Sequence, residues 1–334
     1  MQLRPAPAGA ALAAARPVAG PLAELALPLG VLAAGGVVAL ASALFPTRLP
    51  VWAPYEFSWL EFLATALALG WYVRGARSMP LAERPKLWRG GAFFLGVGLI
   101  YAVLQTHFDY MAQHMFFLNR LQHLVMHHLG PFLIALAWPG AALARGMPAG
   151  LRRQFARPGL HRAVHIAQQP AIAGALFVGI IDIWLIPTVY FRAMIDHRLY
   201  AVMNWSMVVD GIFFWCFVLD PRTSPPARSG FGVRLLTTVL VMFPQIMLGS
   251  YLTFTTHDLY KFYDLCGRLY PSLSALDDQH LGGLFVWIPA SMMSSAAFLL
   301  TLNHLRLTED ARRPEEMTEQ ERRMAELSRR WTGR

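Results

Sequence analysis

The chain alternates between long apolar stretches and short polar joints. Eight apolar stretches stand out. Their lengths are close to about 20 residues, the length with which a helix crosses the hydrocarbon core of a bilayer. They cover residues 21–45, 58–73, 91–106, 121–143, 168–190, 199–219, 233–254 and 282–302. This rhythm predicts an all-α fold, a polytopic transmembrane helix bundle with about eight spans.

Lysines and arginines separate onto alternate joints. If the N-terminus lies inside, 23 of the 29 fall in cytoplasmic segments and five in outer segments, with Arg120 between them. Positive residues stay on the cytoplasmic side during membrane insertion. We therefore expect both termini on the cytoplasmic side, N-in and C-in.

Composition agrees with a membrane protein. Hydrophobic residues make up 55% of the chain and charged residues 15%, against about 25% charged residues in ordinary soluble domains. The net charge of +9 then reflects sidedness, so we expect the lipid bilayer, and no nucleic acid, as a partner. Two cysteines, Cys216 and Cys266, are too few for a thiolate metal site, so a soft metal would need His and Met ligands.

The chain divides into three parts. Residues 1–20 are rich in Ala and Pro and are expected to be disordered. Residues 21–304 form a single transmembrane domain, and residues 305–334 form a charged cytoplasmic tail. The first apolar stretch also fits a signal peptide, because Ala41-Ser42-Ala43 resembles a cleavage site. Cleavage there would leave seven spans.

Histidines are the densest candidate chemistry. Five of the eleven lie in the joint and helix at 106–140. On one continuous helix, the 100° turn per residue places four side chains on one side: His107, Met111, His114 and Met115. His123 and His127 form an i,i+4 pair on another face, a spacing that can place two imidazoles on one metal.

The other outer joints add residues of the same types. We expect the metal ligands to be His107, His114, His123, His127, His197, His257, His280 and Met111. Four aspartates are candidates to orient these imidazoles through hydrogen bonds: Asp109, Asp196, Asp258 and Asp278. The alternative interpretation of these aspartates is that they are solvated loop carboxylates.

Polar and helix-breaking residues also occur inside the predicted spans. Gly130-Pro131 predicts a bend in the fourth stretch. Asp182 and Asp210 lie at similar depth in adjacent stretches, so we expect them to face each other. Two roles are open for this pair: a shared proton that anchors helix packing, or a proton relay.

Three segments carry a family resemblance: QHLVMHHLGPFLIALAWPG at 122–140, MLGSYLTFTTHDLY at 247–260 and DQHLGGLFVWIPA at 278–290. They resemble motifs of the multi-span CtaG family of cytochrome c oxidase assembly factors. The last is the most specific, because it combines Asp, Gln, a Gly pair and Trp at fixed offsets. Asn119 is a departure, since the family often has a histidine there.

The resemblance implies a metallochaperone of the respiratory chain in a bacterial-type inner (plasma) membrane. It would bind copper, as Cu(I), at the extracytoplasmic face and help deliver it to a haem-copper oxidase subunit, without catalysis. A periplasmic copper chaperone is a candidate second partner. Two alternatives use the same histidines: an intramembrane zinc-dependent hydrolase with Glu61 or an outer aspartate as base, and a haem-binding electron carrier.

Overall fold

The computed structural model describes residues 21–46 and 48–332, and every regular element in these ranges is helical. The prediction of a disordered segment at 1–20 lies outside the described residues. The longer elements are α2 (Pro21–Leu44), α3 (Trp59–Ser78), α4 (Leu87–Gln105), α11 (Pro170–Leu185), α13 (His197–Val218), α14 (Phe231–Phe254) and α16 (Ala275–Thr332). A composite helix consists of α6 (Phe116–His123), a π-helical turn η2 (Leu124–Leu129) and α7 (Gly130–Ala137). Shorter elements are η1 (Leu81–Glu83), α5 (His107–Ala112), α8 (Gly140–Gly146), α9 (Ala149–Phe155), α10 (Pro158–Ala167), α12 (Pro187–Ile195) and α15 (Phe262–Cys266).

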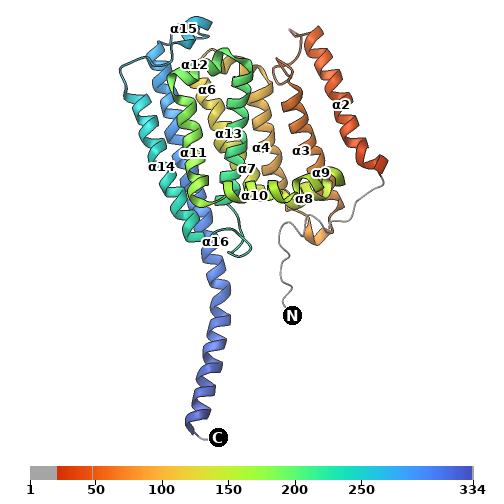
Figure 1. The fold of residues 1–334 in the computed structure, drawn as a ribbon, viewed down its shortest axis with the longest axis vertical. Helices are drawn as coiled ribbons and strands as arrows, with labels where there is room; N and C mark the ends of the chain where they lie inside the picture. The colour runs from red at the N-terminus through yellow and green to blue at the C-terminus, as the bar shows by residue number, and fades with distance from the viewer. Residues whose placement is uncertain (1–20, 47, 333–334) are drawn as a thin grey trace.

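The predicted all-α fold is confirmed, and the described residues contain five to seven candidate spans where the sequence predicted about eight. Five helices in the described part of the chain are long and apolar enough to cross a bilayer, and two bent helix pairs raise the number to seven. The predicted stretch at 58–73 forms α3, which is not among them. This helix carries Glu61 in its first turn, and Arg77 in its last, which shortens its apolar run. It nevertheless stands beside α4 in the bundle (Figure 1).

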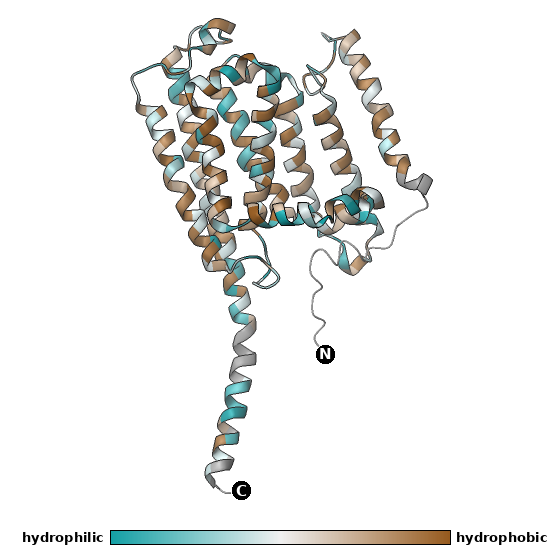
Figure 2. Ribbon diagram, viewed as in Figure 1, coloured by the Kyte–Doolittle hydropathy of each residue, from teal (hydrophilic) through white to brown (hydrophobic). Residues whose placement is uncertain are grey.

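The polar joints gather at two ends of the bundle (Figures 1 and 2). At one end α8, α9 and α10 run across the bundle, because the chain turns by 79° between α7 and α8 and by 76° between α10 and α11. At the other end lie α12, α15 and the beginning of α6. The arginine-rich and histidine-rich joints are therefore separated as the sequence predicts, and which end faces the cytoplasm stays a prediction.

The charged tail continues the last helix. α16 runs unbroken for 58 residues, from Ala275 to Thr332. Its second half projects beyond the bundle and carries mostly polar residues (Figure 2).

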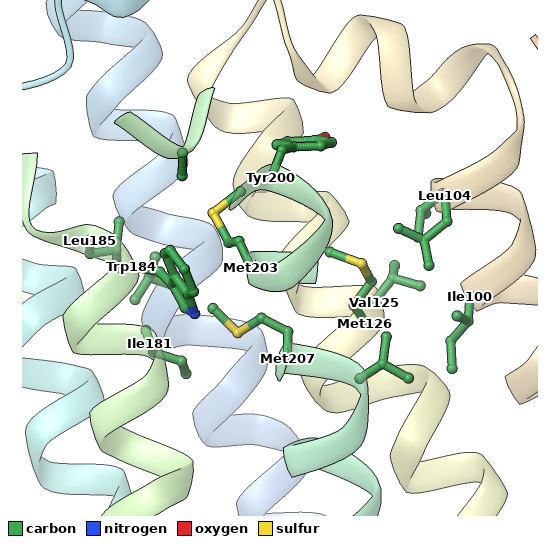
Figure 3. Packing of buried hydrophobic residues seen from close by; sticks show 14 of the residues in the cluster. Ile100, Leu104, Val125, Met126, Ile181, Trp184, Leu185, Tyr200, Met203 and Met207 are labelled. Carbon is green, nitrogen blue, oxygen red and sulfur yellow. The ribbon is translucent and has the colours of Figure 1, made fainter. Parts of the chain in front are cut away.

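Helix α13 is packed at the centre of the bundle. Met203 and Met207 are fully buried, and Figure 3 shows them beside Ile181 and Trp184 of α11. Gly211 lies on the face of α13 turned toward η2, where a Cβ would come within 2.4 Å of the His127 carbonyl oxygen. Glycine thus permits the close approach of two helix backbones, as is common in membrane bundles.

Pro131 explains the π-helical turn. Proline has no N–H to donate to the carbonyl four residues earlier, which is that of His127. The His127 carbonyl instead accepts a hydrogen bond of 3.1 Å from the Trp215 indole Nε1. The predicted bend at Gly130-Pro131 is therefore replaced by a wider turn, and the chain changes direction at Trp138, where φ is 52°.

Substituting Gly211 by Ala should destabilise the protein, because the new methyl group would press against the His127 carbonyl and the Pro131 ring. Overpacking of this kind costs about 1–3 kcal/mol. We expect a melting temperature several degrees lower in detergent. Gly179→Ala is the matched control, since its Cβ meets nothing within 4 Å, and it should melt at or slightly above wild type. Equal melting of both variants would contradict this packing.

Candidate functional site

The helix that carries the histidines is held at its beginning by another helix. The first residues of α6 have no capping side chain of their own, because the N-cap residue is Met115. Asp278 of α16 takes that role: its carboxylate accepts hydrogen bonds from Phe116 N at 3.0 Å and Phe117 N at 2.8 Å. Arg268 also donates to this carboxylate. Asp278 is fully buried, so α16 fixes where α6 starts.

Two glycines bring α16 close to its neighbours. A Cβ on Gly282 would lie 2.3 Å from the Phe116 ring, and one on Gly283 would lie 2.7 Å from the Thr253 backbone nitrogen. Trp287, one turn later, donates from Nε1 to Thr253 Oγ1 at 3.3 Å. The Gly pair and the Trp of the segment at 278–290 therefore lock α16 against α6 and α14.

Gln279 fastens the loop between α14 and α15. Its Oε1 accepts from Leu259 N at 2.8 Å and its Nε2 donates to the His257 carbonyl at 3.0 Å. The segments at 247–260 and 278–290, which carry the family resemblance, thus pack against each other.

Three histidines, at the end of α6 and in η2, line a small cavity inside the bundle. Its volume is about 20 Å³, enough for one water molecule or an ion. The lining residues are Arg120, His123, Leu124, His127, His128, Ile181, Met207, Phe285 and Val286. The cavity therefore brings together the predicted pair, His123 and His127, and adds a buried thioether from α13.

Asp210 sets the tautomer of His127. The His127 Nε2 lies 2.9 Å from Asp210 Oδ2, and both side chains are buried. With the proton on Nε2 and donated to the carboxylate, Nδ1 keeps a free lone pair, and among the described residues it has no hydrogen-bond partner. Phe177 stacks on the ring at 4.2 Å, which fixes its orientation.

The two neighbouring histidines differ in their partners. Both ring nitrogens of His123 are buried without a hydrogen bond to any described residue, although Asn204 is a polar neighbour. His128 Nε2 lies 3.4 Å from the Gln245 amide nitrogen, so Nε2 accepts and the proton lies on Nδ1. His123 and His127 are therefore the two rings with lone pairs available.

Arg120 is buried beside the same cavity. Its guanidinium stacks over Phe116 at 5.0 Å and Tyr190 at 5.1 Å and donates to the Asn119 side chain. Within the described part of the chain it has no carboxylate at ion-pair distance. A cation in the cavity would therefore experience a repulsive neighbour.

The histidines at the mouth of the bundle, the end with α12, α15 and the beginning of α6, do not come together. The predicted continuous helix is wrong, because α5 ends at Ala112 and α6 begins at Phe116. The two helices have separate caps, since Thr106 caps α5 and a side chain of α16 caps α6. The His107 ring packs at a tilt against the Tyr55 ring, with 4.1 Å between their centroids, and His114 Nδ1 lies 2.7 Å from the Tyr110 carbonyl oxygen. Met111, near the end of α5, is half-buried.

The remaining outer histidines come from other helices. His280 Nε2 bonds the Thr255 carbonyl at 2.8 Å, and His197 and His257 are exposed. Across residues 21–46 and 48–332, no three His, Cys, Asp or Glu side chains converge to hold a metal. The outer histidines thus remain predicted ligands that the fold does not gather into one site.

The four aspartates chosen as imidazole partners have other partners. Asp278 caps α6, Asp196 caps α13 by accepting from Arg198 N and Leu199 N, and Asp258 accepts from Tyr260 N. Asp109 accepts from the side chains of Tyr200, Gln122 and Gln113. The carboxylate that does orient a histidine is Asp210, for which the sequence predicted another partner.

The predicted pairing of Asp182 with Asp210 is wrong. Asp210 faces His127, whereas Asp182 is exposed on the outer surface of α11. The signal that could have found the histidine partner was the presence of an ionisable residue inside a span, which is a functional hypothesis by default. Its partner lies 83 residues away in sequence.

Asp109 ends a hydrogen-bonded network at the mouth of the bundle. Its carboxylate accepts from the Tyr200 hydroxyl at 2.8 Å, the Gln122 amide at 2.6 Å and the Gln113 amide at 2.9 Å. Gln122 also donates to the Val103 carbonyl at 2.8 Å. Burial raises the pKa of Asp109 to about 6, although these three hydrogen bonds favour the charged form. This network joins α4, α5, α6 and α13 just outside the histidine cavity.

Comparison with protein-family models gives a match over most of the chain. The family model described as "Cytochrome c oxidase caa3 assembly factor (Caa3_CtaG)" matches residues 70–306. This range includes α6, η2, α13 and the part of α16 inside the bundle. No curated protein and no solved structure matches the chain.

The raised pKa of Asp109 predicts a pH-dependent stability. The folded protein keeps a proton that the unfolded chain, with an ordinary Asp pKa near 3.9, releases. Stability should therefore fall as the pH rises from about 4 to 6, by on the order of 2 kcal/mol. Asp109→Asn should lose this component, and Asp277→Asn, at an exposed position, should keep it. The check is the melting temperature in detergent between these pH values; identical profiles for wild type and Asp109→Asn would refute it.

Proposed function

This chain belongs to the Caa3_CtaG family of cytochrome c oxidase caa3 assembly factors, and we propose that it supports oxidase assembly by binding copper inside the bundle and passing it to an oxidase subunit. Membership implies interaction with cytochrome c oxidase and suggests a role without catalysis. Copper is the cargo in this proposal. It is bound as Cu(I) by His123, His127 and Met207.

One observation carries the proposal: buried imidazole nitrogens without hydrogen-bond partners face a small cavity. Among the described residues, the cavity-lining imidazole nitrogens without a partner are both ring nitrogens of His123 and the Nδ1 atoms of His127 and His128. Nδ1 of His128 carries the proton of its ring, so His123 and His127 supply the free lone pairs. A polar atom buried without a partner costs about 1–3 kcal/mol. A bound metal ion would remove that cost, since the free lone pairs become ligands.

The donor set fits copper. Imidazole nitrogen suits copper, and a thioether favours Cu(I) over harder ions. Met207 supplies the thioether and is fully buried at the same cavity. Asp210 fixes the tautomer and the orientation of the His127 ring, as a carboxylate partner does for metal-binding histidines.

Arg120 makes the proposed site suitable for release. The Arg120 side chain lines the cavity, and within the described chain its guanidinium forms no ion pair with a carboxylate. Repulsion between the guanidinium and the cargo ion lowers affinity. A delivery protein needs such moderate binding, because the oxidase must be able to take the ion.

The outer histidines remain in the proposal as transient ligands. His107, His114, His197, His257 and His280 lie on helix ends and loops toward the end of the bundle that we place outside the cell. There they exchange copper with an oxidase subunit or with a periplasmic copper chaperone. The membrane is the bacterial-type plasma membrane, with both termini in the cytoplasm.

Double substitution of His123 and His127 by Ala tests the proposal. The protein is purified in mild detergent, loaded with Cu(I) under reducing conditions, and its copper is counted by elemental analysis. We expect copper to fall several-fold in His123→Ala/His127→Ala. It should be retained in the matched double variant His257→Ala/His280→Ala. Asp210→Asn should weaken binding by about 10- to 100-fold.

The opposite result would move the site. Unchanged copper in His123→Ala/His127→Ala, with loss in His257→Ala/His280→Ala, would place the cargo at the mouth of the bundle. Stoichiometric zinc together with hydrolysis of lipid esters or amides would favour the hydrolase alternative. A Soret band in the absorption spectrum would favour the haem carrier.

A further inference from the structure

A second cavity, far larger than the first, opens on the other side of α13. Its volume is about 1540 Å³, above the roughly 300–1,000 Å³ of ordinary small-molecule pockets. It is bounded by α3, α4, α7, α8, α13, the loop between α13 and α14, and the ends of α10, α11 and α14. It shares no lining residue with the histidine cavity, so the inference of a ligand here does not rest on the proposed function.

The deep part of this cavity is apolar. Its walls include Ala68 of α3, Val97 of α4, Ile134 of α7 and Ile212 of α13. A surface of this kind lies inside the span region, where water is absent. Alkyl chains are the groups that fill such a space without leaving a polar atom unpaired.

The end of the cavity near α10 is polar and basic. Its lining includes Arg222, Arg228, Arg234, His161 and Asp220. This end of the lining therefore contains three arginines and one carboxylate. The arginines exceed the acid, so this end of the cavity is positive.

Among these arginines of the described chain, Arg228 is the one with a buried donor that lacks a partner. Arg222 is paired with Asp220 through two bonds of 2.9 and 2.7 Å. Arg234 is buried and donates to backbone carbonyls, including that of Ser229 at 2.9 Å. Arg228 Nη1 is buried without a hydrogen-bond partner among the described residues. The unpaired guanidinium group points to an anionic ligand group.

The basic end lies at the level where lipid headgroups are expected. Helix α10 runs across this end of the bundle (Figure 1), at 76° to α11, as a helix lying in the membrane interface does. The positive-inside count also places this end on the cytoplasmic side. Basic pockets between transmembrane helices on that side bind anionic lipid headgroups.

We propose that this cavity binds one anionic phospholipid of the surrounding bilayer, with its phosphate at Arg228 and its acyl chains between α4 and α13. The apolar depth accounts for the chains, and the arginine excess accounts for the charge of the headgroup. The lipid fills the face of α13 opposite Met207. It therefore supports the helix that carries Asp210 from behind.

Lipid retention tests this proposal. The full chain is reconstituted in vesicles with equal parts of phosphatidylglycerol and phosphatidylcholine and re-extracted in mild detergent, and retained phospholipid is quantified by mass spectrometry. We expect phosphatidylglycerol to be enriched several-fold over the vesicle composition. Arg228→Gln should abolish the enrichment, whereas Arg228→Lys should preserve most of it. Arg153→Gln, at an exposed position of α9 outside the cavity, is the matched control and should behave as wild type.

A second variant tests the apolar part. Ala68→Trp fills the deep wall and should lower both retained phospholipids, with the melting temperature confirming a folded protein. The proposal would be overturned if the protein retained the two phospholipids in the same ratio as the vesicles and Arg228→Gln left that ratio unchanged. A cavity that holds only detergent, or a loss of phosphatidylglycerol equal in Arg153→Gln and Arg228→Gln, would overturn it as well.

Discussion

The carboxylate of Asp278 at the start of α6 is the interaction on which the rest of this structure depends. Two backbone N–H groups of α6 and the guanidinium of Arg268 meet on one buried side chain of α16. In an apolar surrounding, an uncapped helix start would leave these donors unpaired, at a cost of several kcal/mol. Because the cap comes from another helix, it fixes the axial position of α6 as well as its start. The Gly282-Gly283 pair then allows α16 to pack at that distance.

The position of the histidines results from that start and from a second constraint further along the same helix. Pro131 withholds an N–H from the His127 carbonyl, and Trp215 supplies the missing donor from α13. The resulting π-helical turn presents His123 and His127 to the same cavity; single π-helical turns occur frequently at functional sites. Asp210, on the same helix as Trp215, then fixes the ring of His127. One helix thus supplies the support for the turn, the histidine partner and the buried thioether.

The architecture can be predicted well from the sequence, but the candidate site can be predicted only in part. Hydropathy is enough to predict a bundle of membrane helices, because each span must satisfy its own backbone hydrogen bonds. It is also enough to predict that the arginine-rich and histidine-rich joints lie at opposite ends of the bundle. The motif at 278–290 is enough to predict the family, and in the structure its Asp, Gln, Gly and Trp residues serve capping and packing. The spacing of His123 and His127 indicates a pair. Which carboxylate faces His127 depends on how two helices pack, because Asp210 lies 83 residues away in sequence. The break between α5 and α6 cannot be predicted from helical periodicity, because it depends on a cap that a side chain of α16 supplies.

X-ray absorption at the copper edge tests most directly whether copper binds inside the bundle. For the Cu(I)-loaded protein we expect imidazole nitrogen and one sulfur around the metal, because His123, His127 and Met207 line one cavity. The sulfur signal should disappear in Met207→Leu and persist in Met111→Leu. A copper shell without sulfur, or a sulfur signal lost only in Met111→Leu, would contradict copper binding at this cavity.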